Sequence, residues 1–331
     1  MMRWKRRKFL AAGLEVLAAM ALAGWAKASK AAPTKEGANS ARDFVVVDAH
    51  THFYDPARAQ GVPWPPRDDK LLYRTVLPKD YRSLPVPKPV MGTVVVEASP
   101  WVEDNQWVLD VAAREPFIVG FVGNLPVGTK RFGGYLKRFA ANPLFRGIRI
   151  RGRKLEGALE ETAFVSDLKL LAQHGLSLDL VGGREVLSFA DGLAKALPDL
   201  GIVIDHLASV AVDGKAPPVD WMQLMRALAR RPKVFCKLSG LVEGTGRTDG
   251  TAPGNVEFYR PVLDAMRDFF GPGRLIYASN WPVSERFAPL ATVQAIVADY
   301  FRARGQQEEE TVFSQSAKAA YRWVERRTSN S

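Results

Sequence analysis

The stretch FVVVDAHTHF, residues 44–53, joins an apolar, β-rich run to two histidines that are two positions apart. Similar runs recur along the chain, and segments with helical periodicity separate them. The candidate strands are residues 44–53, 92–99, 117–125, 146–152, 176–183, 201–208, 234–241 and 275–283. Helix-like segments occur between them, for example at residues 105–116, 165–175 and 221–232. This alternation predicts parallel strands joined by right-handed crossovers.

Eight such units predict a single-domain α/β fold, a (β/α)8 TIM barrel over residues 44–327. A doubly wound open sheet is the alternative, but no glycine-rich dinucleotide loop follows the first strand. Two long connections, residues 53–90 after the first strand and 243–260 after the seventh, contain prolines, glycines and aromatic side chains. Long connections in compact domains are commonly functional. We expect both to cover the C-terminal mouth of the barrel.

The first 28 residues have the composition of a signal peptide. Arg6 and Arg7 precede an apolar stretch that ends in small residues, as in a twin-arginine export signal. Residues 29–43 then form a linker. A single membrane anchor is the alternative, but Glu15 interrupts the short apolar run. We expect a periplasmic or secreted protein with no stable membrane span after signal cleavage.

Charge and cysteine content exclude some classes of function. The formal net charge is +11, and residues 1–28 carry six Lys or Arg and one Glu, so the mature chain is close to +6. The mature chain also lacks a basic run, so nucleic acid is not an expected partner. Cys236 is the only cysteine, which rules out an intramolecular disulfide.

Within each candidate strand, the polar residues lie two positions apart. Side chains two apart share a face of a strand, which groups Asp48 with His50 and His52, Arg149 with Arg151, and Lys237 with Ser239. The outer face of a barrel packs on helices and must be apolar, so we expect these polar residues to point inward. They also come late in their strands, where barrel active sites form.

The chain has four histidines. His50 and His52 have the spacing of metal ligands that converge on one centre. His206 ends the sixth strand in VIDHLA, in phase with Ile202 and Ile204, and we expect it to point inward as well. His174 comes at a predicted helix end, where an imidazole can cap carbonyl groups, so we assign it a structural role.

The motifs VVVDAHTHFYDP, VIDHLA, KLSGL and YASNWPV occur in this order on strands one, six, seven and eight. Together they resemble the amidohydrolase-related family of TIM-barrel metal-dependent hydrolases, and most of all its L-fuconolactonase-like and L-rhamnonolactonase-like sugar-lactonase branch. The resemblance spans the mature chain. It implies that His50, His52 and His206 form the site and bind one divalent metal, with zinc favoured. It also implies an aspartate on strand eight, where this sequence has Asn280.

Asn280 changes the chemistry that the resemblance implies. An amide has neither the negative charge nor the basicity of a carboxylate. Three neutral histidines can still hold zinc, but metal-independent hydrolysis becomes an alternative. We place Asn280 in the catalytic group with His206 and Glu97, the two candidates for general base. Glu97, at the end of strand two and in phase with Val95, has the alternative role of a salt-bridge partner at the mouth.

Two further carboxylates and three cations complete the predicted site. We expect Asp48 to orient a histidine and Asp179 to be structural. Arg149, Arg151 and Lys237 are candidate substrate-binding residues that would hold a small anionic substrate, or else neutralise the nearby carboxylates. Trp281 is a candidate for stacking on a sugar ring, with core packing as its alternative.

Together these observations predict an exported hydrolase that opens a sugar-acid or dicarboxylate lactone, or cleaves a related ester. One alternative is a carboxy-lyase of the same barrel family. The other is a non-catalytic barrel that binds sugar acids.

Overall fold

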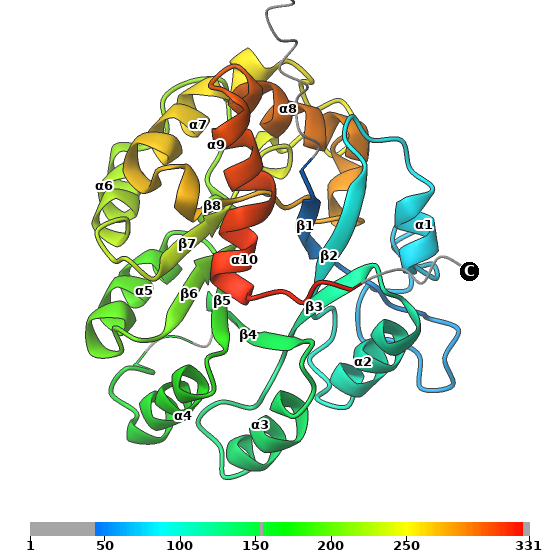
Figure 1. Cartoon of the computed structure of the whole chain (residues 1–331), viewed down its shortest axis with the longest axis vertical. Helices are drawn as coiled ribbons and strands as arrows, with labels where there is room; N and C mark the ends of the chain where they lie inside the picture. Colours follow the sequence, from blue (N-terminus) through cyan, green and yellow to red (C-terminus); the bar gives the residue numbers. More distant parts are fainter. Residues whose placement is uncertain (1–43, 153–154, 156, 327–331) are drawn as a thin grey trace, which may run out of the picture. The chain divides into compact units, whose positions relative to one another are not determined.

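The computed structural model describes residues 44–152, 155 and 157–326. Eight strands form one sheet in the order of the chain, and each pairs in parallel with the next (Figure 1). They are β1 Val46–Thr51, β2 Val90–Val96, β3 Ile118–Gly123, β4 Phe145–Arg151, β5 Ser177–Val181, β6 Gly201–Ile204, β7 Val234–Lys237 and β8 Leu275–Ile276. The residue range of each strand overlaps that of a predicted strand, so the TIM-barrel prediction is confirmed.

Helices follow the strands and cover the outside of the barrel. The α-helices are α1 Pro78–Arg82, α2 Asp104–Arg114, α3 Phe132–Ala140, α4 Thr162–Gln173, α5 Glu185–Ala196, α6 Val219–Leu228, α7 Val256–Phe270, α8 Leu290–Arg302, α9 Gln306–Glu310 and α10 Ser316–Tyr321. The three helix-like segments singled out in the sequence correspond to α2, α4 and α6. The predicted connection 243–260 is too long, because Asn255 accepts the Glu257 N–H and caps α7 from Val256.

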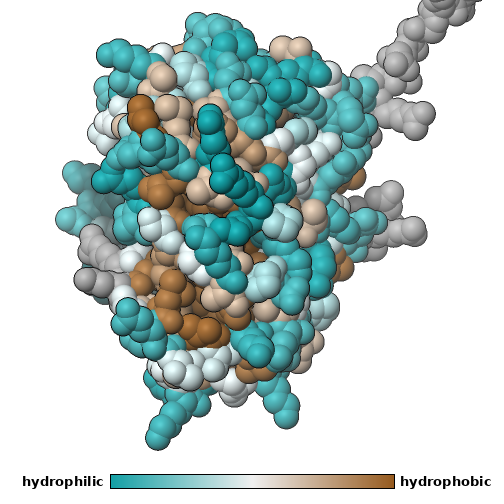
Figure 2. Space-filling view, turned by 90° about the vertical axis from the view of Figure 1, so that its left-hand side faces the viewer, coloured by the Kyte–Doolittle hydropathy of each residue, from teal (hydrophilic) through white to brown (hydrophobic). Residues whose placement is uncertain are grey.

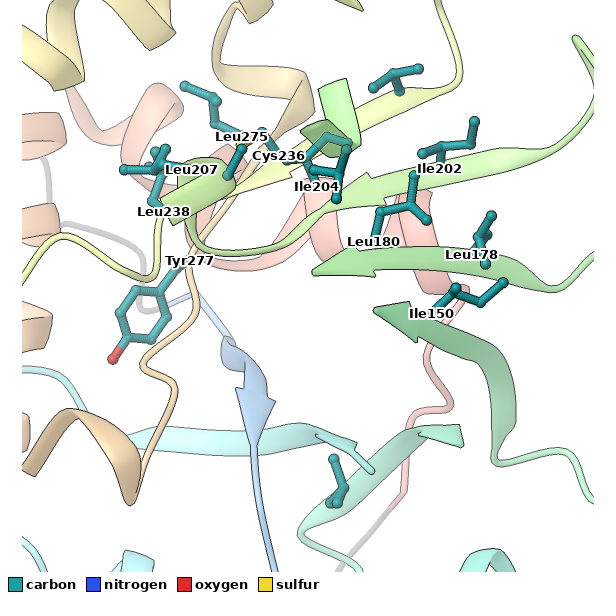
Figure 3. Packing of buried hydrophobic residues seen from close by; sticks show 14 of the residues in the cluster. Ile150, Leu178, Leu180, Ile202, Ile204, Leu207, Cys236, Leu238, Leu275 and Tyr277 are labelled. Carbon is teal, nitrogen blue, oxygen red and sulfur yellow. The ribbon is translucent and has the colours of Figure 1, made fainter. Parts of the chain in front are cut away.

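The helix-facing side of the sheet is apolar, as expected. Figure 3 shows side chains that project from neighbouring strands into this layer: Ile150, Leu178, Leu180, Ile202, Ile204, Cys236 and Leu238. They are buried in one cluster with side chains of the outer helices, such as Leu193 and Met225. Burial of this layer removes apolar surface from water and holds the helices on the barrel.

A second apolar cluster fills the lower part of the barrel interior. It contains Val47, Val94, Val119 and Val203 from the strands, with Ala317, Ala320 and Tyr321 from α10. Helix α10 lies across the strands in Figure 1, and the Ser177 hydroxyl at the start of β5 donates to its Ala320 carbonyl. The polar site is therefore confined to the opposite, C-terminal end of the strands.

The barrel closes between β8 and β1 through a short seam. β8 is only two residues long, and the chain after it continues the pairing as irregular backbone. Ala49 N–H donates to the Tyr277 carbonyl at 3.2 Å, Asn280 N–H to the His50 carbonyl at 2.9 Å, and His52 N–H to the Trp281 carbonyl at 2.9 Å. Closure of the barrel thus places Asn280 beside both histidines of β1.

The predicted signal peptide and linker, residues 1–43, lie outside the described residues. Within the described ranges, none of the helices combines the length and the apolar composition that crossing a membrane requires. Hydrophilic side chains predominate on the face shown in Figure 2, and apolar ones gather in smaller patches.

A substitution at Gly147 in β4 tests how closely β4 and β5 approach each other. A Cβ at Gly147 would overlap the Ser177 carbonyl oxygen, which belongs to the backbone and cannot move aside cheaply. We expect Gly147→Ala to lower the free energy of unfolding by about 1–3 kcal/mol in urea titrations followed by tryptophan fluorescence. Gly133→Ala in α3, where a Cβ meets no atom, is the control, and there alanine should stabilise by up to about 1 kcal/mol. Equal effects at both positions would contradict this account of the strand packing.

Candidate active site at the C-terminal mouth

A β-bulge in β1 separates two residues that we expected on one face. Asp48 pairs with Thr93 and Thr51 with Val95, so three steps on β1 oppose two on β2. A bulge re-aims side chains next to it. The Asp48 carboxylate accepts from the Tyr81 hydroxyl of α1 at 2.8 Å and from the Ser279 N–H at 2.9 Å, outside the barrel, while His50 points into the interior. The predicted shared face of Asp48 and His50 is wrong, and Asp48 contacts only the backbone of His50.

His50 lies at the centre of a buried charge network. Lys237 Nζ is 3.1 Å from its Nδ1, 2.6 Å from Asp179 Oδ2 and 3.0 Å from Asp205 Oδ1. All four side chains are fully buried. The three donors of Lys237 face these internal acceptors, and Lys237 is not among the residues that line the cavity at the mouth. Its predicted substrate-binding role is therefore corrected to neutralisation of Asp179 and Asp205, the alternative weighed from the sequence.

Asp179 has the structural role expected of it. Both its oxygens accept from the Tyr321 hydroxyl, and Oδ2 also accepts from Lys237. Burial raises the pKa of Asp179 to about 6, while Lys237 opposes the shift.

His206 reaches the site by a route that strand alternation did not predict. β6 ends at Ile204, and residues 206–209 adopt positive φ, with φ 52° at His206. Such a run of non-glycine residues is strained and typical of functional sites. Ile202 and Ile204 pack against the helices, so the predicted common phase with His206 is wrong. The left-handed turn brings the imidazole over the barrel, where His206 Nδ1 and the Ser239 hydroxyl form a hydrogen bond of 2.8 Å.

Asp205 is a site residue that the sequence reasoning missed. It shares the inward phase of Val203, and its carboxylate lies 3.5 Å from His50 Nδ1. Burial by itself would raise the pKa of Asp205, but Lys237 and then His50 hold it well below its ordinary range. The motif VIDHLA could have identified it, because Asp205 lies two positions after Val203 and shares its face if Val203 points inward.

Glu97 forms the ion pair that was the alternative to its role as a base. Its carboxylate is 2.8 Å from Arg149 Nη2 and 3.3 Å from Arg151 Nη2. β2 ends at Val96, and Val95 packs against the helices, so the predicted common phase of Glu97 with Val95 is wrong. Two guanidinium groups thus hold this carboxylate in a fixed geometry. Arg149 is buried by this pairing, whereas the Arg151 side chain stays 57% exposed and available at the mouth.

His52, Asn280 and Glu243 form a chain of hydrogen-bonding groups. His52 Nδ1 is 2.9 Å from the Val96 carbonyl, and its Nε2 is 3.2 Å from Asn280 Oδ1. Asn280 Nδ2 lies 2.9 Å from Glu243 Oε1, in the short 3-10 turn Glu243–Thr245 after β7. Burial raises the pKa of Glu243 to about 7. Sequence reasoning assigned this connection to the mouth but did not single out Glu243, because nothing local marks it.

The mouth itself is a cavity of about 170 Å³. Its lining includes His52, Trp64, Arg149, Arg151, His206 and Asn280. Trp64 comes from the long connection after β1, which confirms that this connection reaches the mouth.

Trp281 is not among the residues that line this cavity. It is 1% exposed, packs against Phe53 and Tyr81, and donates its indole N–H to Glu285 at 2.6 Å. The predicted sugar-stacking role of Trp281 is corrected to core packing, and Trp64 is the aromatic side chain at the mouth.

A donor set for a metal ion exists beside this cavity. His50, Asp205 and His206 can each offer one ligand atom, and these atoms lie within 4.8 Å of one another. Both Asp205 oxygens are buried without a hydrogen-bond donor in bonding geometry, even though Lys237 is close as an ion pair. An unsatisfied carboxylate between two imidazoles fits a divalent cation. The set differs from the predicted one by Asp205 in place of His52, whose ring nitrogens face Val96 and Asn280.

The surroundings of the three site histidines favour their neutral form. Burial lowers the pKa of His50 well below its ordinary value, and Lys237 adds to the shift. Burial, followed by Arg149, lowers the pKa of His52 to about 3. Burial also lowers the pKa of His206 to about 4 against the opposing effect of Asp205. Neutral imidazoles are the form that binds metal. His174, by contrast, is an exposed C-cap of α4, as predicted.

Comparison with known proteins decides the family. The model of the Amidohydrolase family Amidohydro_2 matches residues 47–323. The chain belongs to this amidohydrolase family.

Its relatives agree with that assignment. The amidohydrolase is 33% identical over 241 residues to an L-fucono-1,5-lactonase of Burkholderia ambifaria, which covers 72% of this chain and 80% of the relative. It is 26% identical over 275 residues to an L-fucono-1,5-lactonase of Burkholderia multivorans, over 78% of this chain and 89% of the relative. A crystal structure of an amidohydrolase from Burkholderia multivorans with bound zinc has a TM-score of 0.74, at 23% identity over 84% of this chain and 99% of that one. This last likeness concerns the fold. As a member of this family, the protein is a hydrolase.

Removal of the buried ammonium tests the charge network. In Lys237→Met, Asp179 and Asp205 keep their burial and lose their shared cation. We expect a loss of about 3–5 kcal/mol in the free energy of unfolding, measured in urea at pH 7. Lys233→Met, which breaks an exposed pair with Asp199, is the control and should cost far less. A small loss at Lys237 would contradict the inferred network.

The donor set makes a second prediction. The purified amidohydrolase should take up a divalent cation after dialysis against zinc or manganese, as measured by elemental analysis. Asp205→Asn should lower this uptake, because it removes the only anionic ligand, and Asp199→Asn on the surface should not. Uptake that survives Asp205→Asn but is lost in His52→Gln would instead support the histidine set predicted from the sequence.

Proposed function

We propose that this amidohydrolase hydrolyses the ester bond of a small lactone, with sugar-acid lactones as the first substrate class. The observation that carries the proposal is the mouth cavity lined by His52, His206, Asn280 and Arg151, in a chain 33% identical to an L-fucono-1,5-lactonase. A cavity of about 170 Å³ is small, which favours a compact ring over a polymer.

Two side chains at the mouth suit binding of such a substrate. Arg151 keeps more than half of its side chain exposed while it touches Glu97, so its guanidinium can hold a hydroxyl, carboxylate or ring oxygen. Trp64, whose ring is 5.8 Å from His52, can cover one face of a sugar ring and exclude water. Arg149 contributes indirectly, because it holds Glu97 in place.

The reaction requires water to attack the lactone carbonyl and a proton to reach the leaving ring oxygen. His206 and Asn280 both face the cavity and can orient water or the carbonyl oxygen by hydrogen bonds. A divalent cation held by His50, Asp205 and His206 would polarise the carbonyl and make bound water more acidic. Lys237 and Asp179 keep His50 and Asp205 oriented, and Ser239 fixes the ring of His206.

A panel of aldonolactones, assayed with and without a chelator, tests the proposal. We expect turnover of at least one sugar-acid lactone, and a loss of roughly 10²-fold or more in kcat/KM for His206→Ala. His174→Ala, which alters the exposed histidine at the end of α4, is the matched control and should keep full activity. Absence of turnover on the whole panel, with or without added metal, would refute lactone hydrolysis and favour a binding protein.

A further inference from the structure

A second, smaller cavity lies beside the mouth cavity, and we call it the side cavity. Its volume is about 20 Å³, which is room for about one water molecule. Its walls come from the connection after β1, from the residues that follow β2, from α2 and from β3. They include the aromatic side chains Phe53, Tyr54, Trp64, Trp107 and Phe121. Trp64 and Ala98 line the side cavity and the mouth cavity alike.

The ring of Trp64 lies between the two cavities. Its centroid is 5.8 Å from that of His52, which lines the mouth, and 5.3 Å from that of Tyr54, which lines the side cavity. Ala98, the other shared residue, has only a methyl group and cannot fill the space between them. The indole of Trp64 is therefore the side chain that keeps the two cavities apart.

Trp64 is held in this position from both sides. Tyr54, against which its ring packs, is fixed because its backbone pairs with Val76 and its hydroxyl donates to the Leu72 carbonyl at 2.8 Å. Prolines at positions 63, 65 and 66 restrict the backbone around Trp64, since a proline ring fixes φ. Trp64 is thus a built part of the wall.

The charged and amide side chains of the side cavity are bonded to partners, with one exception. Arg58 donates to both oxygens of Asp104 at 2.9 and 3.3 Å, and the Asn105 amide bonds to the backbone of Asn124. The exception is Glu97, whose Oε2 is buried without a hydrogen-bond donor. A group that entered would meet aromatic walls and a carboxylate, and no unpaired cation among the described residues of the lining. The side cavity therefore suits a neutral, apolar group and rejects an anionic one.

We propose that Trp64 is a specificity-determining residue that closes the side cavity and so limits the substrate to a compact lactone without a long apolar substituent. For its effect on turnover, this inference rests on the proposed lactone hydrolysis. A substituent longer than a methyl group, directed from the mouth toward α2, meets the indole. Loss of the indole joins the two cavities through the space that it fills, and exposes Phe53, Trp107 and Phe121 to the mouth.

Thiol labelling tests the separation of the cavities without reference to activity. Val108 lines the side cavity and is 6% exposed, so Val108→Cys places a thiol of similar size there, while the native Cys236 is fully buried. We expect a small neutral thiosulfonate to label the new thiol slowly when Trp64 is present. In Trp64→Ala the labelling, followed by mass spectrometry, should be about tenfold faster or more, because the thiol is then open to the mouth.

Two controls accompany the labelling. Trp101 is 42% exposed and lines neither cavity, so Trp101→Ala should label as slowly as the protein with all its tryptophans. Cys236 should stay unlabelled throughout, which shows that faster labelling is not caused by unfolding. If Trp64→Ala becomes labelled at Cys236 as well, the comparison is made with Trp64→Val, which keeps part of the packing on Tyr54. Equal labelling rates with and without the indole would overturn the proposal.

A series of δ-lactones with alkyl substituents of increasing length tests the effect on specificity. In the wild type, kcat/KM should fall once the substituent is longer than methyl. Trp64→Ala should raise the ratio of kcat/KM for the pentyl substrate to that for the methyl substrate by about tenfold or more. Trp107→Ala, which enlarges the side cavity but leaves Trp64 in place, should keep the wild-type ratio. A carboxylate at the end of the chain should remove the gain in Trp64→Ala, because Glu97 repels it.

The two measurements separate failure of this inference from failure of the proposed function. A wild type that hydrolyses no lactone would refute the proposed function, and thiol labelling would still decide whether Trp64 separates the cavities. A wild-type substrate ratio in Trp64→Ala, despite faster labelling, would overturn the role of Trp64 in specificity. A raised ratio in Trp107→Ala as well would show that the size of the side cavity, and not its closure by Trp64, sets the limit.

Discussion

The seam between β8 and β1 is the constraint on which the site depends. β8 supplies only two paired residues, and closure relies on backbone bonds that run through Ala49, His52 and Asn280. The Asp48 carboxylate reinforces this seam, since it accepts from the backbone of Ser279 and of His50 and from the Tyr81 hydroxyl. One buried side chain therefore ties together both strands of the seam and the helix that covers them. Together with the backbone bonds, this tie fixes the distance between His52 and Asn280.

The charged side chains inside the barrel are buried, so their charges must be balanced by partners. Arg149 and Glu97 form one pair, and Lys237 with Asp179 forms a second. Asp205 shares Lys237 but keeps two oxygens without a hydrogen-bond donor, so it is the group that remains to attract a cation. Buried charges require partners, and this requirement decides which residues are structural and which remain for chemistry. His206 and Asn280, which both have a left-handed backbone conformation, belong to the second group.

The amide of Asn280 suits its contact with Glu243. An aspartate at this position would place a second carboxylate next to Glu243, and two carboxylates in contact resist joint ionisation. The amide avoids this repulsion and joins Glu243 to His52 instead. The acidic group in contact with Asn280 is therefore Glu243, in the connection that follows β7.

The sequence by itself determined the eight-stranded barrel, the strand order and the end at which the site lies, because apolar runs and helical periods are local patterns. It also identified the histidines, Glu97 and the two arginines. Only the tertiary structure decided the roles of Asp205, Glu243, Lys237 and Trp281. Strand alternation assumes regular strands, and it failed at the bulge after Asp48 and where β6 gives way to the left-handed turn at His206. Glu243 and Asn280 are 37 residues apart, and only the pairing of β7 with β8 brings them into contact.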